Sequence, residues 1–315
     1  MLNMALRSFE WTFITKKPLR KYEWSEGQDT PVERPLSIVN VLLDAADLFF
    51  NLRGLGWSWS SRPFPRQYTP PPSIASALAG TLLKFTVLDI SHYILHLMNP
   101  ALDKTGGGSL FDATIPFLPH PVTVALATCI AGVWVYMQVD STYHVAMLIG
   151  RILLGQPASH WPSLFRQPWM ATSVREFWSA RWHQMFRHFF VVFGARPGGA
   201  LLGELGAVMG AFGLSGFMHI VGMWGIGREM EVRHDMGFFL LMGVGTILES
   251  AFQRATGSHV RGWLGRLWTM AWSIWWGSFL VDSWARRGIF AVDFFPDHLR
   301  PGKLLIDSAI SLFSK

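Results

Sequence analysis

Two histidine-containing segments could carry chemistry. His219 lies in the apolar, glycine-rich stretch GAFGLSGFMHIVGMWGIG. Glycines at positions 206, 210, 213 and 216 let neighbouring helix backbones approach, so the imidazole must face protein or a cavity rather than lipid. Burial favours the neutral ring, which is the form that a general base requires. The same histidine could instead donate one hydrogen bond between helices, and the pattern alone leaves both interpretations open.

The second histidine, His183, lies in EFWSARWHQMFRH (176–188), where aromatic and cationic side chains alternate. Helical spacing of three and four residues would place Trp178, Trp182 and Phe186 on one face. We therefore expect an amphipathic helix at the membrane surface. It could be an interfacial anchor, or a cytosolic gate for an anionic cofactor, because arginine is well suited to binding phosphates.

The composition predicts that a membrane surrounds these segments. Hydrophobic residues make up 50% of the 315 residues and charged residues only 15%, and the mean hydropathy is +0.26. The 16 tryptophans and 30 glycines point the same way, since Trp is enriched at the bilayer interface and Gly where membrane helices pack. The net charge of +6 is then explained by basic loops facing anionic lipid rather than by nucleic acid.

Five segments are long and apolar enough to cross a bilayer, which takes about 20 residues. They are residues 74–98, 121–154, 199–225, 236–252 and 263–285. Residues 36–52 and 304–313 are expected to be interfacial or re-entrant. We predict an all-α, polytopic membrane bundle of about five to seven spans enclosing a reaction cavity. It would occupy residues 36–315, after a cytosolic or interfacial segment, 1–35.

Loop charge gives the expected orientation, because cytosolic loops carry an excess of Lys and Arg. Residues 151–198 contain six arginines and one acid, whereas residues 99–120 contain one lysine and two aspartates. The segment 151–198 and the amino terminus are therefore expected in the cytosol.

Ionisable residues within spans are costly and mark candidate sites. His92 and His96 are spaced as two metal ligands on one helical face would be. This spacing would fit a membrane di-iron hydroxylase, but the sequence has no HxxHH box, so packing or lining of a cavity is the preferred interpretation. Glu249 and Asp282 could each tune a histidine, although hydrogen bonds between helices are favoured for both.

Other reaction classes fit the sequence poorly. Ser215 lacks the second glycine of Gly-x-Ser-x-Gly, because Phe217 stands there. The single cysteine, Cys129, has no flanking base and lies among apolar residues. A transporter would be supported by broken helices in two repeated halves, and no repeat is visible.

Taken together, the two histidine segments resemble the wax synthase-like branch of the membrane-bound O-acyltransferases. FWSARWHQMFR and the later FGLSGFMH are similar to that branch's Phe-Trp-Gly-Arg-Arg-Trp-(His or Asn) block and Ser-Gly-x-x-His. NLRGLGWSW, GFFLLMGVGTILESAF and RLWTMAWSIWWGSFLVDSW extend the resemblance over residues 36–290. Ser179 and Ala180 stand where the family commonly has Gly and Arg.

The resemblance implies acyl transfer from acyl-CoA to an alcohol, with no permanently bound cofactor and no metal. His219 matches the family's catalytic histidine, which would take the proton of the acceptor hydroxyl. His183 matches a second polar position, which would orient the acyl carbonyl or donate to the oxyanion. Arg181, Gln184 and Arg187 are expected to support the CoA end.

The His-Gln pair after Trp182 and the short chain look more like fungal enzymes that acetylate terpenoid or meroterpenoid natural products. We therefore expect acetyl-CoA as co-substrate, a lipophilic alcohol of that class as acceptor, and a multi-pass protein of the endoplasmic reticulum membrane. The alternative within the family is a long-chain-alcohol O-fatty-acyltransferase, that is, a wax ester synthase.

Overall fold

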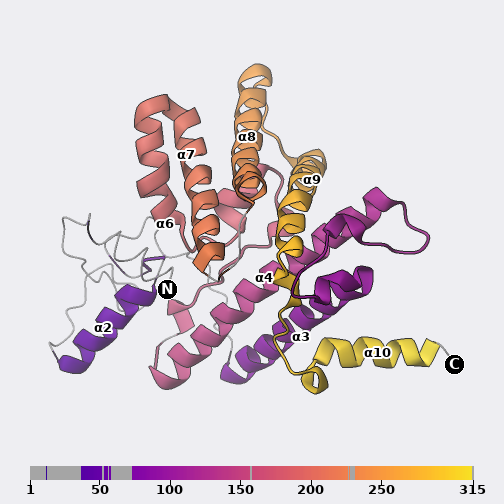
Figure 1. Ribbon diagram of the computed structural model, residues 1–315. Helices are drawn as coiled ribbons and strands as arrows, with labels where there is room; N and C mark the ends of the chain where they lie inside the picture. Colours follow the sequence, from indigo (N-terminus) through magenta and orange to yellow (C-terminus); the bar gives the residue numbers. More distant parts are fainter. Residues whose placement is uncertain are drawn as a thin grey trace.

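A computed structural model describes residues 12, 37–51, 53–55, 57, 73–156, 158–225, 227 and 231–313. The predicted amino-terminal segment 1–35 lies outside these residues except for Thr12, so the division into that segment and a domain over 36–315 stays a prediction. Within the described residues, all the long regular elements are helices (Figure 1). The predicted all-α class is therefore confirmed.

The long helices lie close to the predicted segments. They are α2 (Ile38–Phe50), α3 (Ile74–Met98), α4 (His120–Leu153), α7 (Arg196–Gly225), α8 (Val232–Thr256), α9 (Gly262–Arg286) and α10 (Pro301–Phe313). Short elements connect them: η1 (Pro100–Asp103), η2 (Leu110–Asp112), η3 (Ala158–His160), η4 (Pro168–Met170), α5 (Val174–Glu176), η5 (Phe177–Arg181), α6 (Arg187–Phe189), η6 (Phe190–Ala195), η7 (Ile289–Ala291) and η8 (Asp297–Leu299).

Four helical stretches in the described part are long and apolar enough to cross a membrane. They are Ile74–Met98, His120–Leu153, Arg187–Gly225 and Val232–Thr256. Helix α9 has the necessary length of 25 residues, but its many Trp, Ser and Gly residues lower its hydropathy. The predicted integral membrane bundle is therefore confirmed, with α9 the least apolar of its five predicted spans.

Helices α3 and α4 pack along each other and form the main core with the segment after α9 (Figure 1). Leu88, Leu95 and Phe290 are almost completely buried there. An ion pair joins the two helices, with Lys84 Nζ 3.0 Å from the buried Asp140 carboxylate. The two charges satisfy each other, which is how ionisable side chains are accommodated inside a membrane protein.

The stretch Arg187–Gly225 is a helical hairpin. Its backbone leaves the helical region at Leu202 (φ −132°, ψ 19°) and Gly203 (φ 61°, ψ −143°), and the chain reverses there (Figure 1). The first arm, 187–201, is about 22 Å long and too short for a hydrocarbon core of about 30 Å, whereas the second arm, 204–225, is about 33 Å long. Only the second arm is long enough to span.

Glycines on both arms permit this close hairpin. A Cβ atom added to Gly206 would collide with the Gly198 carbonyl, and one added to Gly210 would collide with the Gly194 carbonyl. Gly216 instead meets Met236 of α8, and Gly213 faces Leu240 at an ordinary contact distance. The predicted role in close helix approach is thus confirmed for Gly206, Gly210 and Gly216 but not for Gly213.

One prediction about this region is wrong. The segment 199–225 is not one continuous spanning helix, because Gly203 adopts a positive φ and turns the chain. Residues 187–198, at the end of the arginine-rich segment 151–198, belong to the first arm of the hairpin. The cytosolic location of the segment 151–198 stays a prediction.

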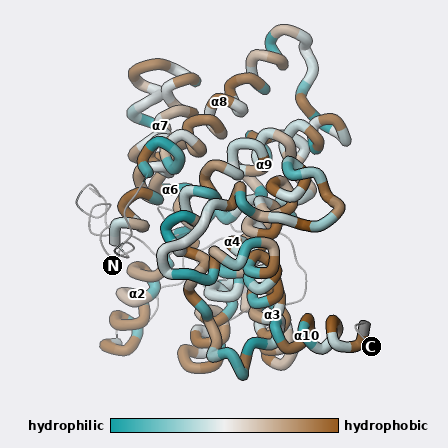
Figure 2. Tube along the Cα trace, turned by 45° about the vertical axis from the view of Figure 1, so that its right-hand side comes forward, coloured by the Kyte–Doolittle hydropathy of each residue, from teal (hydrophilic) through white to brown (hydrophobic). Residues whose placement is uncertain are grey.

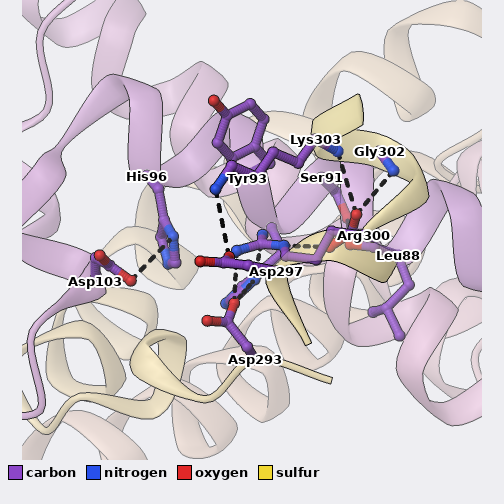
Figure 3. A network of polar contacts seen from close by, with 12 residues as sticks. Leu88, Ser91, Tyr93, His96, Asp103, Asp293, Asp297, Arg300, Gly302 and Lys303 are labelled. Carbon is purple, nitrogen blue, oxygen red and sulfur yellow. Dashed lines mark hydrogen bonds and ion pairs between the residues drawn. The ribbon is translucent and has the colours of Figure 1, made fainter. Parts of the chain in front are cut away.

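The carboxyl-terminal helix α10 is attached to α3 through a buried ion pair. Arg300 Nε donates to Asp89 Oδ1 at 2.9 Å, and both side chains are almost completely buried. Asp89 Oδ2 also accepts from the backbone N–H of Gly302 at 2.8 Å, at the start of α10. Figure 3 shows Arg300 and Gly302 in this polar network. A carboxylate is favourable at a helix amino terminus, where unpaired N–H groups point outward. Asp89 therefore fixes where α10 begins.

Apolar side chains also cover much of the outer surface. Figure 2 shows hydrophobic residues along most of α2 and over much of the hairpin. Exposed examples are Leu42, Leu201, Leu202, Leu304 and Leu305. An apolar exterior of this extent is the expected surface of a protein surrounded by lipid.

Candidate active site

Helix α5, which leads into the predicted catalytic block, is anchored by Glu249 of α8. The Glu249 carboxylate accepts from the backbone N–H groups of Val174 (2.6 Å) and Arg175 (3.0 Å), and from Trp268 Nε1 (2.8 Å). Ser173 caps the same helix by accepting from Glu176 N at 2.9 Å. Glu249 therefore links α8, α9 and the block, and the preferred interpretation of it as a packing residue fits these contacts.

The block itself is not the continuous amphipathic helix that the spacing predicted. One π-helical stretch, η5, ends at Arg181, and Trp182 is extended (φ −69°, ψ 156°) before the chain turns into α6. The chain therefore stops being helical at Trp182, and His183 lies in the non-helical stretch that follows. π-Helical turns are rare and are frequently found at functional sites. The prediction missed this break because the sequence contains no Gly or Pro there.

His219 is held by an aromatic neighbour on α8. Its ring stacks on Phe239, with centroids 4.5 Å apart and an interplanar angle of 18°. Phe239 also contacts the edge of Trp178 at 6.1 Å. Trp178 makes further edge contacts with Phe212 and Phe238. We call the rings of Trp178, Phe212, Phe238 and Phe239 the aromatic box; it brings the block of η5 next to His219.

His183 lies on the other side of Trp182. Its ring contacts Trp182 and Phe165, both with centroids 5.8 Å away, and Phe186 at 6.2 Å. Burial lowers the pKa of His183 to about 3, and His219 is close enough for a positive charge on its ring to lower that pKa further. The structure thus brings the two predicted catalytic histidines into one site, with His183 neutral.

Three buried polar atoms of the block have no hydrogen-bond partner among the described residues. They are Trp178 Nε1, His183 Nδ1 and Gln184 Oε1. Buried polar atoms in native proteins are nearly always paired, and unpaired ones need an explanation such as a bound ligand or water. One donor, one acceptor and one imidazole nitrogen, all within seven residues, could bind the polar atoms of a thioester and an alcohol.

The three residues predicted to support CoA differ in how free they are. Arg181 donates from Nε to Glu176 at 2.6 Å and from Nη1 to the Arg166 carbonyl at 3.0 Å, which holds the preceding loop. Gln184 Nε2 donates to the carbonyls of Trp178 and Trp182. Arg187 is half-buried, and its guanidinium makes no ion pair or hydrogen bond with a described residue. Arg187 is therefore the most available cation beside His183.

The histidine pair of α3 has a packing role. His92 Nε2 and His96 Nε2 lie 2.6 Å and 2.7 Å from the carbonyl oxygen of Phe290. No group of three potential metal ligands occurs among the residues that the structure describes. The carbonyl group of Phe290, which both imidazole rings contact, ties α3 to the segment after α9.

Asp282 is also hydrogen-bonded within the fold, because its carboxylate accepts from Ser109 Oγ at 2.6 Å and from Leu110 N at 2.8 Å.

Aromatic residues of the site escaped the sequence reasoning. Phe239 and Phe165 contact the two histidines, but a Phe in an apolar helix looks like any core residue. Trp178 was noted only as part of an aromatic face. One feature of the sequence could have indicated Phe239. Phe238 and Phe239 are adjacent on a helix, and adjacent residues cannot lie on the same helix face. The two rings must therefore contact different neighbouring helices.

The chain matches the Membrane bound O-acyl transferase family over residues 161–241. This range includes both histidines, Trp178 and the aromatic box. The predicted resemblance is confirmed, and with it the assignment of the chain as an O-acyltransferase that uses an acyl donor and an alcohol-type acceptor.

Two relatives share this similarity over most of the chain, and a third over less than half of it. The O-Mevalon transferase macI of Penicillium terrestre is 25% identical over 311 residues, which are 87% of this chain and 70% of that protein. The acetyltransferase eriL of Hericium erinaceus is 26% identical over 283 residues, covering 84% and 71%. A long-chain-alcohol O-fatty-acyltransferase of Simmondsia chinensis is 30% identical over 134 residues, covering 40% and 37%.

Proposed function

We propose that this O-acyltransferase transfers an acetyl group from acetyl-CoA to a hydroxyl of a lipophilic terpenoid or meroterpenoid acceptor. The proposal rests on the similarity to acetyltransferases such as that of Hericium erinaceus over most of the chain. The membrane of the endoplasmic reticulum, where lipophilic acceptors can reach the protein through the bilayer, is the proposed location.

In the proposed reaction, His219 is the general base. Its neutral imidazole accepts the proton of the acceptor hydroxyl as the hydroxyl oxygen bonds to the thioester carbon. The carbonyl π electrons move to oxygen, and the resulting oxyanion is stabilised by donors in the block. Collapse of this intermediate re-forms the carbonyl and breaks the carbon–sulfur bond. The CoA thiolate leaves and takes the proton back from His219.

His183 and Trp178 are the proposed oxyanion donors. Trp178 Nε1–H and, in the tautomer protonated on Nδ1, His183 N–H are buried and have no partner among the described residues. Donors that are already in place and free of water stabilise the transition state without reorganisation. The Phe239 ring stacked on His219 limits the rotation of the base. Arg187 is proposed to bind a phosphate of CoA.

The observation that carries this proposal is the convergence of the two histidines with three unpaired polar atoms around the aromatic box. His183 comes from the break after η5 and His219 from the second arm of the hairpin. Two separate segments thus supply a base and an oxyanion donor to one place, as a bond-forming acyl transfer requires.

The test compares products from membranes that contain the wild-type chain or His219→Ala. Each preparation receives acetyl-CoA or palmitoyl-CoA with a mixture of terpenoid and fatty alcohols, and esters are identified by mass spectrometry. We expect acetyl esters of a terpenoid alcohol that depend on His219. Palmitoyl esters of fatty alcohols would instead establish the wax ester synthase activity that the Simmondsia chinensis relative favours.

A second variant separates loss of chemistry from loss of folding. His144 lies on α4, half-buried, and its Nδ1 is 2.8 Å from the Asp140 carbonyl of its own helix. His144→Ala is therefore a matched histidine variant outside the site, and it should keep its activity. If His219→Ala remains as active as His144→Ala, His219 is not the base.

A further inference from the structure

A pocket with a volume of about 250 Å³ lies between α8 and α9. Its walls are apolar and mostly aromatic: Phe238, Leu241, Trp276 and Phe279, with Gly237 between them. Two polar side chains, Arg233 and His234, line it toward the amino-terminal end of α8. The pocket is thus an apolar chamber with one polar end, as is typical of small-molecule sites.

The pocket adjoins the aromatic box through one shared side chain. Phe238 lines the pocket and also makes an edge contact with Trp178, with centroids 6.0 Å apart. Phe238 lies 5.1 Å from Phe239, which stacks on His219. A molecule seated in the pocket is therefore separated from the proposed base by only two rings of the box.

The polar end of the pocket has a cation available for binding. The Arg233 side chain is exposed and has no ion pair or hydrogen bond with a described residue. His234 Nδ1 lies 3.0 Å from the Glu231 carboxylate but makes no hydrogen bond with a described residue. A free guanidinium at the end of an apolar pocket binds a carboxylate or another hydrogen-bond acceptor well, because it presents several donors in one plane.

We infer that this pocket holds the body of the acceptor alcohol during the reaction. The apolar body lies against Trp276, Phe279 and Leu241, with its hydroxyl end at Phe238, the wall of the pocket nearest to the aromatic box. A second polar group at the far end of the molecule contacts Arg233. The acceptor class is then a terpenoid-sized alcohol with a hydrogen-bond acceptor or carboxylate opposite its reacting hydroxyl. This inference rests on the proposed acyl transfer.

Gly237→Leu tests the pocket directly. A Cβ atom at Gly237 meets nothing within 4 Å, so the larger side chain can enter the pocket without displacing the backbone. Gly132 of α4 also has nothing within 4 Å of such an atom and is exposed. Gly132→Leu is therefore the matched control, with the same change on another spanning helix.

Two probes are used as acceptors: farnesol, and the analogue of farnesol with a carboxylate at the far end of its chain. We expect Gly237→Leu to raise the KM of both at least tenfold, with the acetyl-CoA KM and the slow hydrolysis of acetyl-CoA unchanged. Gly132→Leu should leave all three values unchanged. Arg233→Gln should remove the preference for the carboxylate analogue and leave the KM of farnesol the same.

Binding is measured separately by crosslinking a diazirine derivative of farnesol and mapping the labelled peptide. Labelling within residues 233–241 that Gly237→Leu abolishes supports the inference. An unchanged acceptor KM in Gly237→Leu, with active transfer, overturns the pocket assignment while the proposed function stands. Absence of His219-dependent transfer and of acetyl-CoA hydrolysis in the wild-type chain overturns the proposed function first, and this inference with it.

Discussion

The ring of Phe239 lies parallel to the imidazole of His219, with centroids 4.5 Å apart and an interplanar angle of 18°. The two residues come from adjacent helices, α8 and the second arm of the hairpin. A stacked ring restricts rotation of the imidazole and leaves both ring nitrogens at the free edge. The orientation of the proposed base is thus set by a residue that carries no polar group.

Phe239→Leu is expected to lower kcat about tenfold, which corresponds to about 1.4 kcal/mol, because Leu fills the volume but cannot stack. The acetyl-CoA KM should stay the same, since Phe239 contacts the base and not the arginines. Steady-state kinetics measures both values. Phe252→Leu, at an exposed position of the same helix, is the control. A kcat as high as that of the control would show that stacking does not orient His219.

The hairpin predicts opposite outcomes for two glycines of one helix. Gly206→Ala should lower the free energy of unfolding by about 1 to 3 kcal/mol, because the new methyl group collides with the Gly198 carbonyl. Gly213→Ala should be neutral or stabilise by up to about 1 kcal/mol, since Leu240 lies at an ordinary 3.8 Å. Thermal unfolding in detergent compares them, and equal Tm values would contradict the close approach of the arms.

Glu249→Gln is expected to destabilise the block by about 1 to 3 kcal/mol. The carboxylate accepts three N–H groups, and an amide would direct a donor at one of them. Activity should fall together with Tm. Glu204, at the exposed tip of the hairpin, pairs with Arg175 and Arg254. Glu204→Gln should therefore cost less than about 1 kcal/mol. Equal losses would remove the anchoring role of Glu249.

His183 makes stability depend on pH. Its pKa in the folded protein is about 3, below the ordinary 6.5, so between these values the unfolded chain binds a proton that the folded chain does not. Stability from this group is complete above pH 6.5 and decreases as the pH falls toward 3. At pH 5 the loss is about 2 kcal/mol. Wild-type Tm should fall more steeply from pH 7 to 5 than that of His183→Asn; parallel curves would contradict the shift.

The two arginines of the block should respond differently to replacement. Arg187→Ala should raise the acetyl-CoA KM, by about tenfold if one phosphate contact of about 1.4 kcal/mol is lost, and leave Tm unchanged. Arg181→Ala should lower Tm, because Arg181 holds Glu176 and the Arg166 carbonyl. Kinetics and thermal unfolding on both variants check this. An unchanged KM in Arg187→Ala would leave that residue without a role in CoA binding.

Helix positions could be predicted from the sequence because apolar length alone decides them. The segment predicted for α3 has the same bounds as the helix, and α4, α8 and α9 differ from their predictions by a few residues. The reversal at Leu202–Gly203 could not be predicted in this way. Both arms contain long apolar runs, and contacts such as that between Gly198 and Gly206 are what distinguish a hairpin from a straight span.

The sequence could predict which two histidines are candidates for the site, but not how they are positioned relative to each other. The apolar, glycine-rich segment indicated His219, since ionisable side chains are rare in apolar helices, whereas His183 was indicated only by the resemblance of its block to the acyltransferase motif. Helical periodicity then failed at Trp182, because a π-helical stretch followed by an extended residue has no signature in the composition of this block. The role of Glu249 depends on contacts with Val174 and Arg175, which are distant in sequence and meet only after folding.

The ion pair between Asp89 and Arg300 has a consequence for biosynthesis. The two residues are 211 positions apart, so α3 leaves the ribosome long before its partner is made. Until then the Asp89 carboxylate has no guanidinium beside it, in a helix destined for the membrane, where an unpaired charge is costly. Completion of the fold therefore waits for the last part of translation. A chain that stops before Arg300 retains an uncompensated acid, which is a recognisable defect for the quality control of membrane proteins.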